Sequence, residues 1–210
     1  MAGSSGVGKS ALGHEVHKPI TAKRGFFIEG KFDQYQRNIP YFAWGQAFSR
    51  LVSQLLTENE TRLHASKSQI LEAIGKNGKV LTDVIPNLEL VIGPQPEVAQ
   101  LGGQEAQNRF NYRFKKFIKA VARPEHPLVI FLDDLQWIDS ASLSLLKNLL
   151  SDSDQNHFLL IGAYRDNEVD ATHPLMKAVA ELEKKAVGLE RIILQNLTES
   201  DVNKLVADSL

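Results

Sequence analysis

The residues best suited to chemistry stand at the start of the chain, where Gly3 to Ser10 spell the Walker A (P-loop) pattern G-x-x-x-x-G-K-[ST]. In such a loop the backbone N–H groups surround phosphate oxygens, the lysine reaches the β- and γ-phosphates, and the hydroxyl binds Mg²⁺. The residues predicted to bind a nucleoside triphosphate are Gly3, Ser4, Ser5, Gly6, Val7, Gly8, Lys9, Ser10 and Ala11. A flexible Gly/Ser linker is the alternative interpretation, but Val7 to Leu12 lead directly into a helical pattern.

A pair of carboxylates ends an apolar run further along the chain, Val129-Ile-Phe-Leu-Asp133-Asp134, which fits the Walker B pattern. Mg²⁺ prefers oxygen ligands, and a second acid can orient or deprotonate an attacking water. We predict that Asp133 binds Mg²⁺ together with Ser10 and that Asp134 activates the water. In the alternative interpretation the two acids only begin a turn and cap the next helix, which the upstream P-loop makes the weaker choice.

Arg165 ends a further apolar run, 159–165. The carboxyl ends of parallel strands gather on the ligand side of a sheet, so we predict that Arg165 senses the γ-phosphate and stabilises charge in the transition state. The alternative is a surface arginine paired with Asp166 or Glu168. Trp137 is interpreted as a core residue, and the role of Gln136 is left open.

The remaining polar residues give weaker signals. Glu29, Lys31 and Asp33 stand at or after the end of a predicted strand and so could lie near the site, but they are interpreted as solvated loop residues. His14 and His17 share one predicted helix, but no further ligand is evident, so we predict no zinc site.

Hydrophobic patterns predict the elements that must hold these residues in place. Apolar runs predict strands, and apolar residues at helical spacing predict helices between them. The expected strands are 26–29, 128–132, 158–164 and 191–194. The expected helices are 10–17, 41–57, 66–74, 80–85, 104–122, 140–151, 174–185 and 200–210, with an irregular stretch at 87–103.

Because apolar strands alternate with helices, we predict an α/β fold of the P-loop NTPase type, a three-layer α/β/α arrangement with a parallel sheet. Only Met1 and Ala2 precede Gly3. We therefore expect the first strand of this sheet to be missing and the chain to be a fragment that starts at the P-loop.

Composition excludes several classes of protein. The 210 residues include 24 basic and 25 acidic side chains, for a formal net charge of −1, so whole-chain charge gives no reason to expect nucleic acid or an anionic membrane as partner. There is no cysteine, which excludes disulfides and thiolate metal sites. The longest apolar runs are too short to cross a bilayer, and no signal peptide precedes the P-loop, so we expect a cytoplasmic protein.

Three motifs in combination, the P-loop, Leu132–Trp137 and Gly162–Arg165, resemble AAA-like ATPase modules of the origin-recognition group and of the STAND signalling ATPases. Segments such as Phe27–Gln34 and Glu105–Phe110 are more similar still to the ATPase segment inside large bacterial multidomain signalling kinases. In those proteins a serine/threonine kinase domain precedes the segment, and sensor and histidine-kinase domains can follow it. The resemblance covers nearly the whole chain.

The resemblance implies ATP as the nucleotide, phosphate binding by Lys9 and its neighbours, a Mg²⁺ ligand in Asp133, catalysis by Asp134 and γ-phosphate sensing by Arg165. It also implies an ATPase core at residues 1–197 and the beginning of a helical lid at 198–210. No kinase domain is present in the chain, so kinase activity is not expected of it. The partners implied are ATP and the neighbouring kinase or sensor domains of a signalling protein, or a partner chain.

The leading hypothesis is therefore an ATP-binding and ATP-hydrolysing regulatory switch in signal transduction. One alternative is a nucleotide-dependent interaction scaffold with negligible hydrolysis, and another is an inactive partial gene product.

Overall fold

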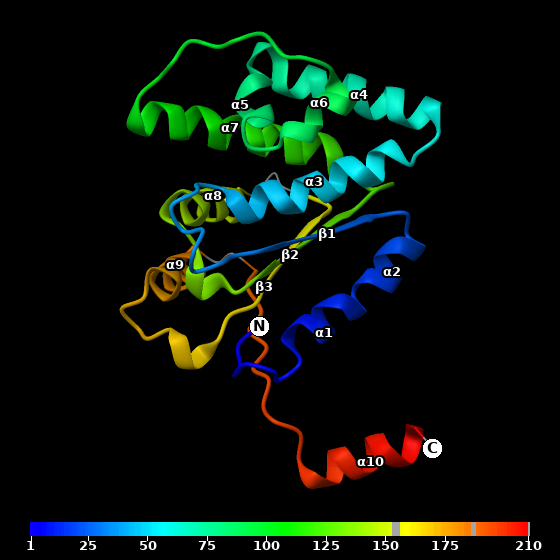
Figure 1. Ribbon diagram of the computed structural model, residues 1–210, viewed down its shortest axis with the longest axis vertical. Helices are drawn as coiled ribbons and strands as arrows, with labels where there is room; N and C mark the ends of the chain where they lie inside the picture. Colours follow the sequence, from blue (N-terminus) through cyan, green and yellow to red (C-terminus); the bar gives the residue numbers. More distant parts are fainter. Residues whose placement is uncertain (153–155, 186–187, 210) are drawn as a thin grey trace.

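The structure is a computed structural model that describes residues 1–152, 156–185 and 188–209; Leu210, the last residue of the expected C-terminal helix, lies outside them. Within this part of the chain the sheet has three parallel strands in the order β1-β2-β3. The strands are β1 (Phe26–Lys31), β2 (Leu128–Asp133) and β3 (Phe158–Gly162). The predicted α/β fold with a parallel sheet flanked by helices is confirmed (Figure 1).

Ala2 lies in the plane of the sheet beyond β3. It forms parallel bridges with Tyr164 on one side and with Ile193 on the other. Leu194 N–H donates to the Ala2 carbonyl at 2.9 Å. The expected strand 191–194 is thus reduced to a single bridge, because its neighbour in the sheet offers only Ala2 for pairing. The same pairing brings the segment that begins at Gly3 to the edge where β2 and β3 end.

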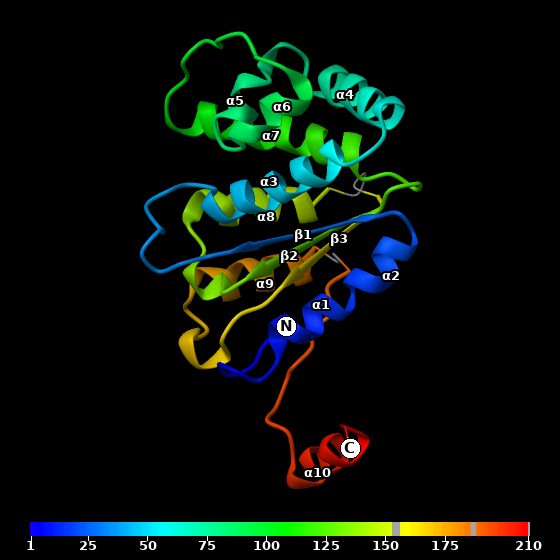
Figure 2. The ribbon, with the colours of Figure 1, turned by 45° about the vertical axis from the view of Figure 1, so that its right-hand side comes forward.

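Helices cover both faces of the sheet, α1 and α2 on one face and α3 with α8 on the other (Figure 2). The helices near the sheet are α1 (Lys9–Glu15), α2 (His17–Ala22), α3 (Phe42–Leu56), α8 (Ser140–Leu150) and α9 (Pro174–Lys184). The last helix, α10 (Glu199–Ser209), stands apart from the sheet (Figure 1). Alternate residues of the central strand explain the two layers: Val129 and Phe131 face α1, whereas Ile130 belongs to the larger core under α3. The expected helix 10–17 is broken in two at Val16.

α1 lies very close to the sheet because Gly13 faces Phe131. A Cβ atom at Gly13 would stand 2.5 Å from Cε2 of the Phe131 ring, so a larger residue would force the helix or the ring to shift. The glycine therefore sets the height of α1 above β2, and with it the position of the loop that leads into the helix.

The chain between β1 and β2 forms α3 and then a helical layer, which packs on the side of α3 that faces away from the sheet (Figure 1). It contains α4 (Glu60–Ile74), α5 (Lys79–Thr82), α6 (Glu89–Ile92) and α7 (Gly103–Val121). Buried aromatic rings join it to α3, with Phe48 and Phe114 at 4.8 Å between ring centroids.

Two expectations about this layer were wrong in detail. α4 begins at Glu60 rather than at Ser66, since the Asn59 side chain accepts a hydrogen bond from the backbone N–H of Arg62 at 3.0 Å and so caps the first turn. The stretch 87–103 is not irregular throughout, because it contains α6 and part of the 3₁₀ turn Pro86–Leu88.

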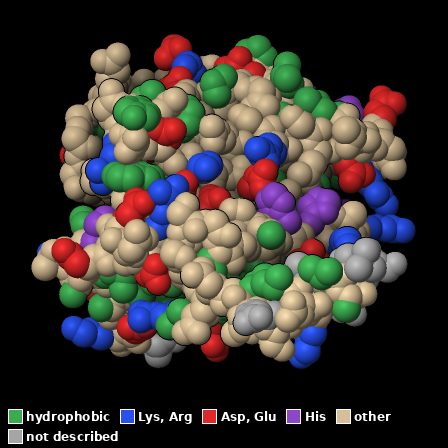
Figure 3. All heavy atoms as spheres, turned by 60° about the horizontal axis from the view of Figure 1, so that its bottom comes forward, with side chains coloured by type: hydrophobic (Ala, Val, Ile, Leu, Met, Phe, Trp, Pro, Cys, Tyr) green, Lys and Arg blue, Asp and Glu red, His purple; other side chains and the backbone are tan. Residues whose placement is uncertain are grey.

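The face that carries α1 and α10 shows acidic and basic side chains intermixed, with apolar side chains between them (Figure 3). This mixture agrees with the near-zero net charge of the sequence. Among the described residues, no helix combines the length and the apolar character that crossing a membrane requires.

Candidate nucleotide-binding site

The segment Gly3–Ser10, here called the glycine loop, joins Ala2 to the first turn of α1. Gly6 and Gly8 have φ angles of 79° and 96°, in the left-handed region that favours glycine. A Cβ atom at either position would meet nothing within 4 Å, so the glycines are required by their backbone conformation and not by a close neighbour.

Lys9 lies across this loop. The residue is only 7% exposed, and Nζ donates to the carbonyl oxygens of Gly3 at 2.8 Å and Ser4 at 2.7 Å. The two carbonyl oxygens accept hydrogen bonds from the ammonium group and so hold the lysine side chain at the glycine loop.

Ser10 follows the glycine loop near the start of the chain, and Asp133 is the last residue of β2. The two residues meet at the carboxyl edge of the sheet. Ser10 Oγ donates to Asp133 Oδ2 at 2.7 Å. The other carboxylate oxygen, Oδ1, accepts the backbone N–H of Asp134 at 2.9 Å. A hydroxyl beside a carboxylate is a pair of hard oxygen donors of the kind Mg²⁺ selects.

No group of three or more His, Cys, Asp or Glu side chains that could hold a metal occurs among the described residues. The Ser10–Asp133 pair is therefore unlike a closed protein cage. It fits a Mg²⁺ ion that takes most of its ligands from water and from a bound phosphate.

Asp134 is the most buried acid of the site, with 6% exposure and a left-handed φ of 53°. Its Oδ2 lies 3.3 Å from Lys31 Nζ, and its Oδ1 lies 3.4 Å from Arg165 Nε. Gln136 Nε2 donates to the same Oδ1 at 3.0 Å. Two positive charges and one amide therefore surround the carboxylate.

Arg165 makes the pairing with Glu168 that was the alternative interpretation of the sequence, and it also contacts Asp134. Its Nη1 donates to Glu168 Oε1 at 2.7 Å, as expected for a paired surface arginine, while its Nε faces Asp134. The hydrogen bond to Glu168 is the main reason why the pKa of Arg165 is raised; partial burial opposes that rise, and the charge of Asp134 adds to it. The guanidinium group is thus held at the end of β3 by two acids.

The interpretation of Lys31 as a solvated loop residue was wrong. Lys31 is the last residue of β1 and stands opposite Asp133 in the β1–β2 register, which brings its amino group to Asp134. The signal that could have found it is its place at the end of a strand next to the one that carries the acid pair. Asp33 does behave as a loop residue, since its Oδ1 accepts the backbone N–H of Tyr35 at 2.7 Å.

Glu29 lies two residues before Lys31 in β1, and its contacts are with residues other than Asp134. Its carboxylate contacts His14 Nε2 at 2.7 Å and forms an ion pair with Arg50 of α3. Glu29 therefore links helices from the two faces at the outer edge of β1.

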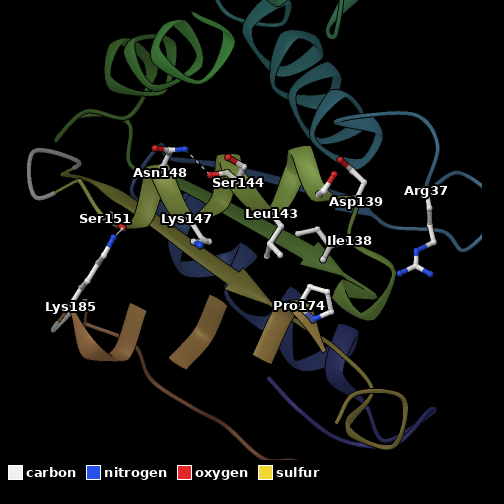
Figure 4. Close-up of a pocket in the computed structure, with 11 residues that line it drawn as sticks. Arg37, Ile138, Asp139, Leu143, Ser144, Lys147, Asn148, Ser151, Pro174 and Lys185 are labelled. Carbon is white, nitrogen blue, oxygen red and sulfur yellow. Dashed lines mark hydrogen bonds between the residues drawn. The ribbon is translucent and has the colours of Figure 1, made fainter. Parts of the chain in front are cut away.

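A separate groove of about 690 Å³ runs between α8 and α9. The side chains of Leu143 and Lys147 extend from α8 toward α9, and Arg37 and Pro174 lie at one end (Figure 4). The lining includes none of the residues predicted to bind nucleotide or Mg²⁺. Trp137 precedes Ile138, one of the residues that line the groove. It is half-buried, and the Arg37 guanidinium lies 5.3 Å from its ring centroid.

Comparison with known proteins supports a nucleotide-binding module. Residues 1–161 match the family described as "AAA ATPase domain". The chain is 41% identical over 150 residues to "Hybrid signal transduction histidine kinase G" of Dictyostelium discoideum, an alignment that covers 71% of this chain and 4% of that protein. It is 23% identical over 166 residues to "Histidine protein kinase 1" of Candida albicans, covering 71% of this chain and 7% of that protein.

The chain therefore spans less than a tenth of the length of these two relatives. No solved structure was found to match it. The expected relationship to signal-transduction kinases is confirmed at this level, while the more specific resemblance to STAND proteins and to bacterial kinases stays a prediction.

Proposed function

The chain belongs to the AAA ATPase domain family, and on that premise we propose that it is an ATP-binding and ATP-hydrolysing switch module of a signal-transduction protein. The observation that carries this proposal is the 2.7 Å contact between Ser10 Oγ and Asp133 Oδ2 beside the glycine loop. A hydroxyl on the loop and a carboxylate on a strand end meet where a metal-bound triphosphate needs both.

Binding is the first role that we assign. The residues Gly3 to Ala11 hold the triphosphate through backbone N–H groups and the amino end of α1. Lys9 exchanges the Gly3 and Ser4 carbonyls for phosphate oxygens. Ser10 and Asp133 would hold a Mg²⁺ ion, which would supply positive charge to the β- and γ-phosphates.

Hydrolysis is the second role. Asp134 accepts a proton from the attacking water, since it is the carboxylate that lies next to the proposed metal ligand without being engaged by Ser10. Arg165 supplies positive charge toward the γ-phosphate from the end of β3. The contact between Lys31 Nζ and Asp134 Oδ2 at 3.3 Å positions the second oxygen of the carboxylate.

Signalling is the third role. We propose that residues 1–197 form the ATPase core and that residues 198–210 begin a helical lid. α10 starts with a reciprocal cap, in which Thr198 N–H donates to Asp201 Oδ2 at 3.0 Å and Asp201 N–H donates to Thr198 Oγ1 at 3.2 Å. A lid or neighbouring domain that docks differently in the ATP and ADP states would transmit the nucleotide state to kinase or sensor domains.

A nucleotide-dependent scaffold with negligible hydrolysis is the second candidate. The observation that favours it is the engagement of both Asp134 oxygens by Lys31, Arg165 and Gln136, which leaves less of the carboxylate for water.

Single-turnover hydrolysis separates the two candidates. Purified protein in excess over radiolabelled ATP and Mg²⁺ is followed for phosphate release, while binding of a fluorescent ATP analogue is measured in parallel. Release that disappears in Lys9→Ala supports the ATPase. Tight binding without release above the rate in buffer supports the scaffold, and failure to bind nucleotide rejects both.

A further inference from the structure

Gln136 lies directly behind the proposed catalytic carboxylate and is bonded at both ends of its amide. The residue is 2% exposed. Its Nε2 donates to Asp134 Oδ1 at 3.0 Å, and its Oε1 accepts the backbone N–H of Arg165 at 3.2 Å. Because a backbone N–H can only donate, the amide oxygen must face Arg165, and the NH₂ group must therefore face Asp134.

The turn that carries Gln136 is fastened to the end of β3 by successive hydrogen bonds. Ala163 N–H donates to Leu132 O, and Leu135 N–H donates to Ala163 O, each at 2.9 Å. A Cβ atom on Gly162 would stand 2.5 Å from Leu135 Cδ1, so the turn packs tightly against the strand. The Gln136 amide adds a further hydrogen bond between this turn and the segment after β3, to the Arg165 N–H, and it joins Asp134 to the same network.

A purely structural role does not account for the choice of residue. Neighbouring positions of the turn, Leu135 and Ile138, are buried and apolar. An amide buried to this extent stabilises the fold only if its polar atoms find partners. Both partners of Gln136 belong to proposed site residues, one through a carboxylate and the other through the backbone that carries the guanidinium group.

We propose that Gln136 is a positioning residue for ATP hydrolysis, orienting the Asp134 carboxylate and fixing its distance from the Arg165 backbone. This inference rests on the proposed ATPase function. Gln136 acts through Asp134, so its removal lowers the rate of the chemical step and leaves nucleotide binding almost unchanged.

A double-mutant cycle tests this dependence. Gln136→Met, Asp134→Asn and the double variant are compared with the unchanged chain by single-turnover hydrolysis and by binding of a fluorescent ATP analogue. Gln136→Met should lower the hydrolysis rate about tenfold or more, because a misplaced proton acceptor loses much of its effect, and should change Kd less than about twofold. In the Asp134→Asn background the same substitution should change the residual rate less than about twofold.

The control is Gln104→Met, since Gln104 lies on the exposed first turn of α7 and bonds Asn108. It should behave as the unchanged chain. If Gln136→Met fails to melt cooperatively, Gln136→Glu replaces it, because glutamate keeps an acceptor for the Arg165 N–H but replaces the donor to Asp134 with a carboxylate oxygen that repels the Asp134 carboxylate. The same non-additive loss is then expected.

Equal fractional losses in both backgrounds would show that Gln136 supports the fold without acting through Asp134, and would overturn the proposal. An unchanged rate in Gln136→Met would overturn it as well. Absence of hydrolysis in the unchanged chain would refute the ATPase function and this inference together, whereas hydrolysis without coupling refutes the inference alone.

Discussion

Asp134→Asn separates the chemistry of the site from its stability. Asparagine has nearly the same shape and can still accept from Gln136, but it loses the charge that faces Lys31 Nζ at 3.3 Å and Arg165 Nε at 3.4 Å. The side chains of Lys31 and Arg165 are 64% and 32% exposed, so water screens both ion pairs. Each pair is worth about 0.2–1 kcal/mol, and the variant should lose about 1 kcal/mol of the free energy of unfolding.

The effect on catalysis should be much larger. A positioned proton acceptor contributes roughly 10²- to 10⁴-fold to a rate, which corresponds to about 3–5 kcal/mol of activation free energy. The loss of stability corresponds to a Tm lower by only about 2–4 °C for a chain of this size. Asp134→Asn should therefore stay folded and bind ATP while its hydrolysis falls at least about 100-fold.

Phosphate release, binding of a fluorescent ATP analogue and thermal melting are measured on the same preparation. The matched control is Asp166→Asn, which makes the same chemical change on a nearby exposed carboxylate. Hydrolysis by Asp134→Asn within about threefold of the unchanged chain would refute the assignment of Asp134 as proton acceptor, because so small a loss is far below the range for such a group. If Asp134→Asn no longer melts cooperatively, the expected loss of only about 1 kcal/mol in the free energy of unfolding is refuted.

Three further predictions concern the loop, the sheet and pH. Lys9→Ala should weaken ATP binding about 10- to 100-fold by calorimetry, the range for a lost charged hydrogen bond, and unchanged affinity would contradict the binding role. Gly13→Ala should lower stability in denaturant by about 1–2 kcal/mol, since overpacking against Phe131 at 2.5 Å exceeds the gain in helix propensity; a more stable variant would disprove the close contact. The hydrogen bond and charge of Lys147 lower the pKa of Glu181 from its ordinary 4.5, so this pair stabilises the folded state above that value and its contribution is lost as pH falls through the lowered pKa. The Tm difference between the unchanged chain and Glu181→Gln should accordingly be present at about pH 7 and vanish near pH 3, and a difference that grows with acid would reverse the sign.

Much of the fold follows from local patterns. Apolar runs located β1, β2 and β3, and helical spacing located α3 and α7 to within a residue or two. The start of α4 was missed because its first turns are polar, although Asn59 gave the capping signal. The strand expected at 191–194 failed for a different reason, since a strand forms only as far as a neighbour pairs with it.

The candidate site also combines local and tertiary information. The sequence by itself determined the pair Lys9 and Ser10 and the pair Asp133 and Asp134, because the members of each pair are adjacent in the chain and each pair belongs to a motif of known chemistry. Only the tertiary structure decided that Lys31 and Gln136 face Asp134. The Lys31 contact depends on the register of β1 against β2, and the Gln136 contact, although it joins residues two apart, depends on a turn that is fixed by hydrogen bonds to the segment after β3.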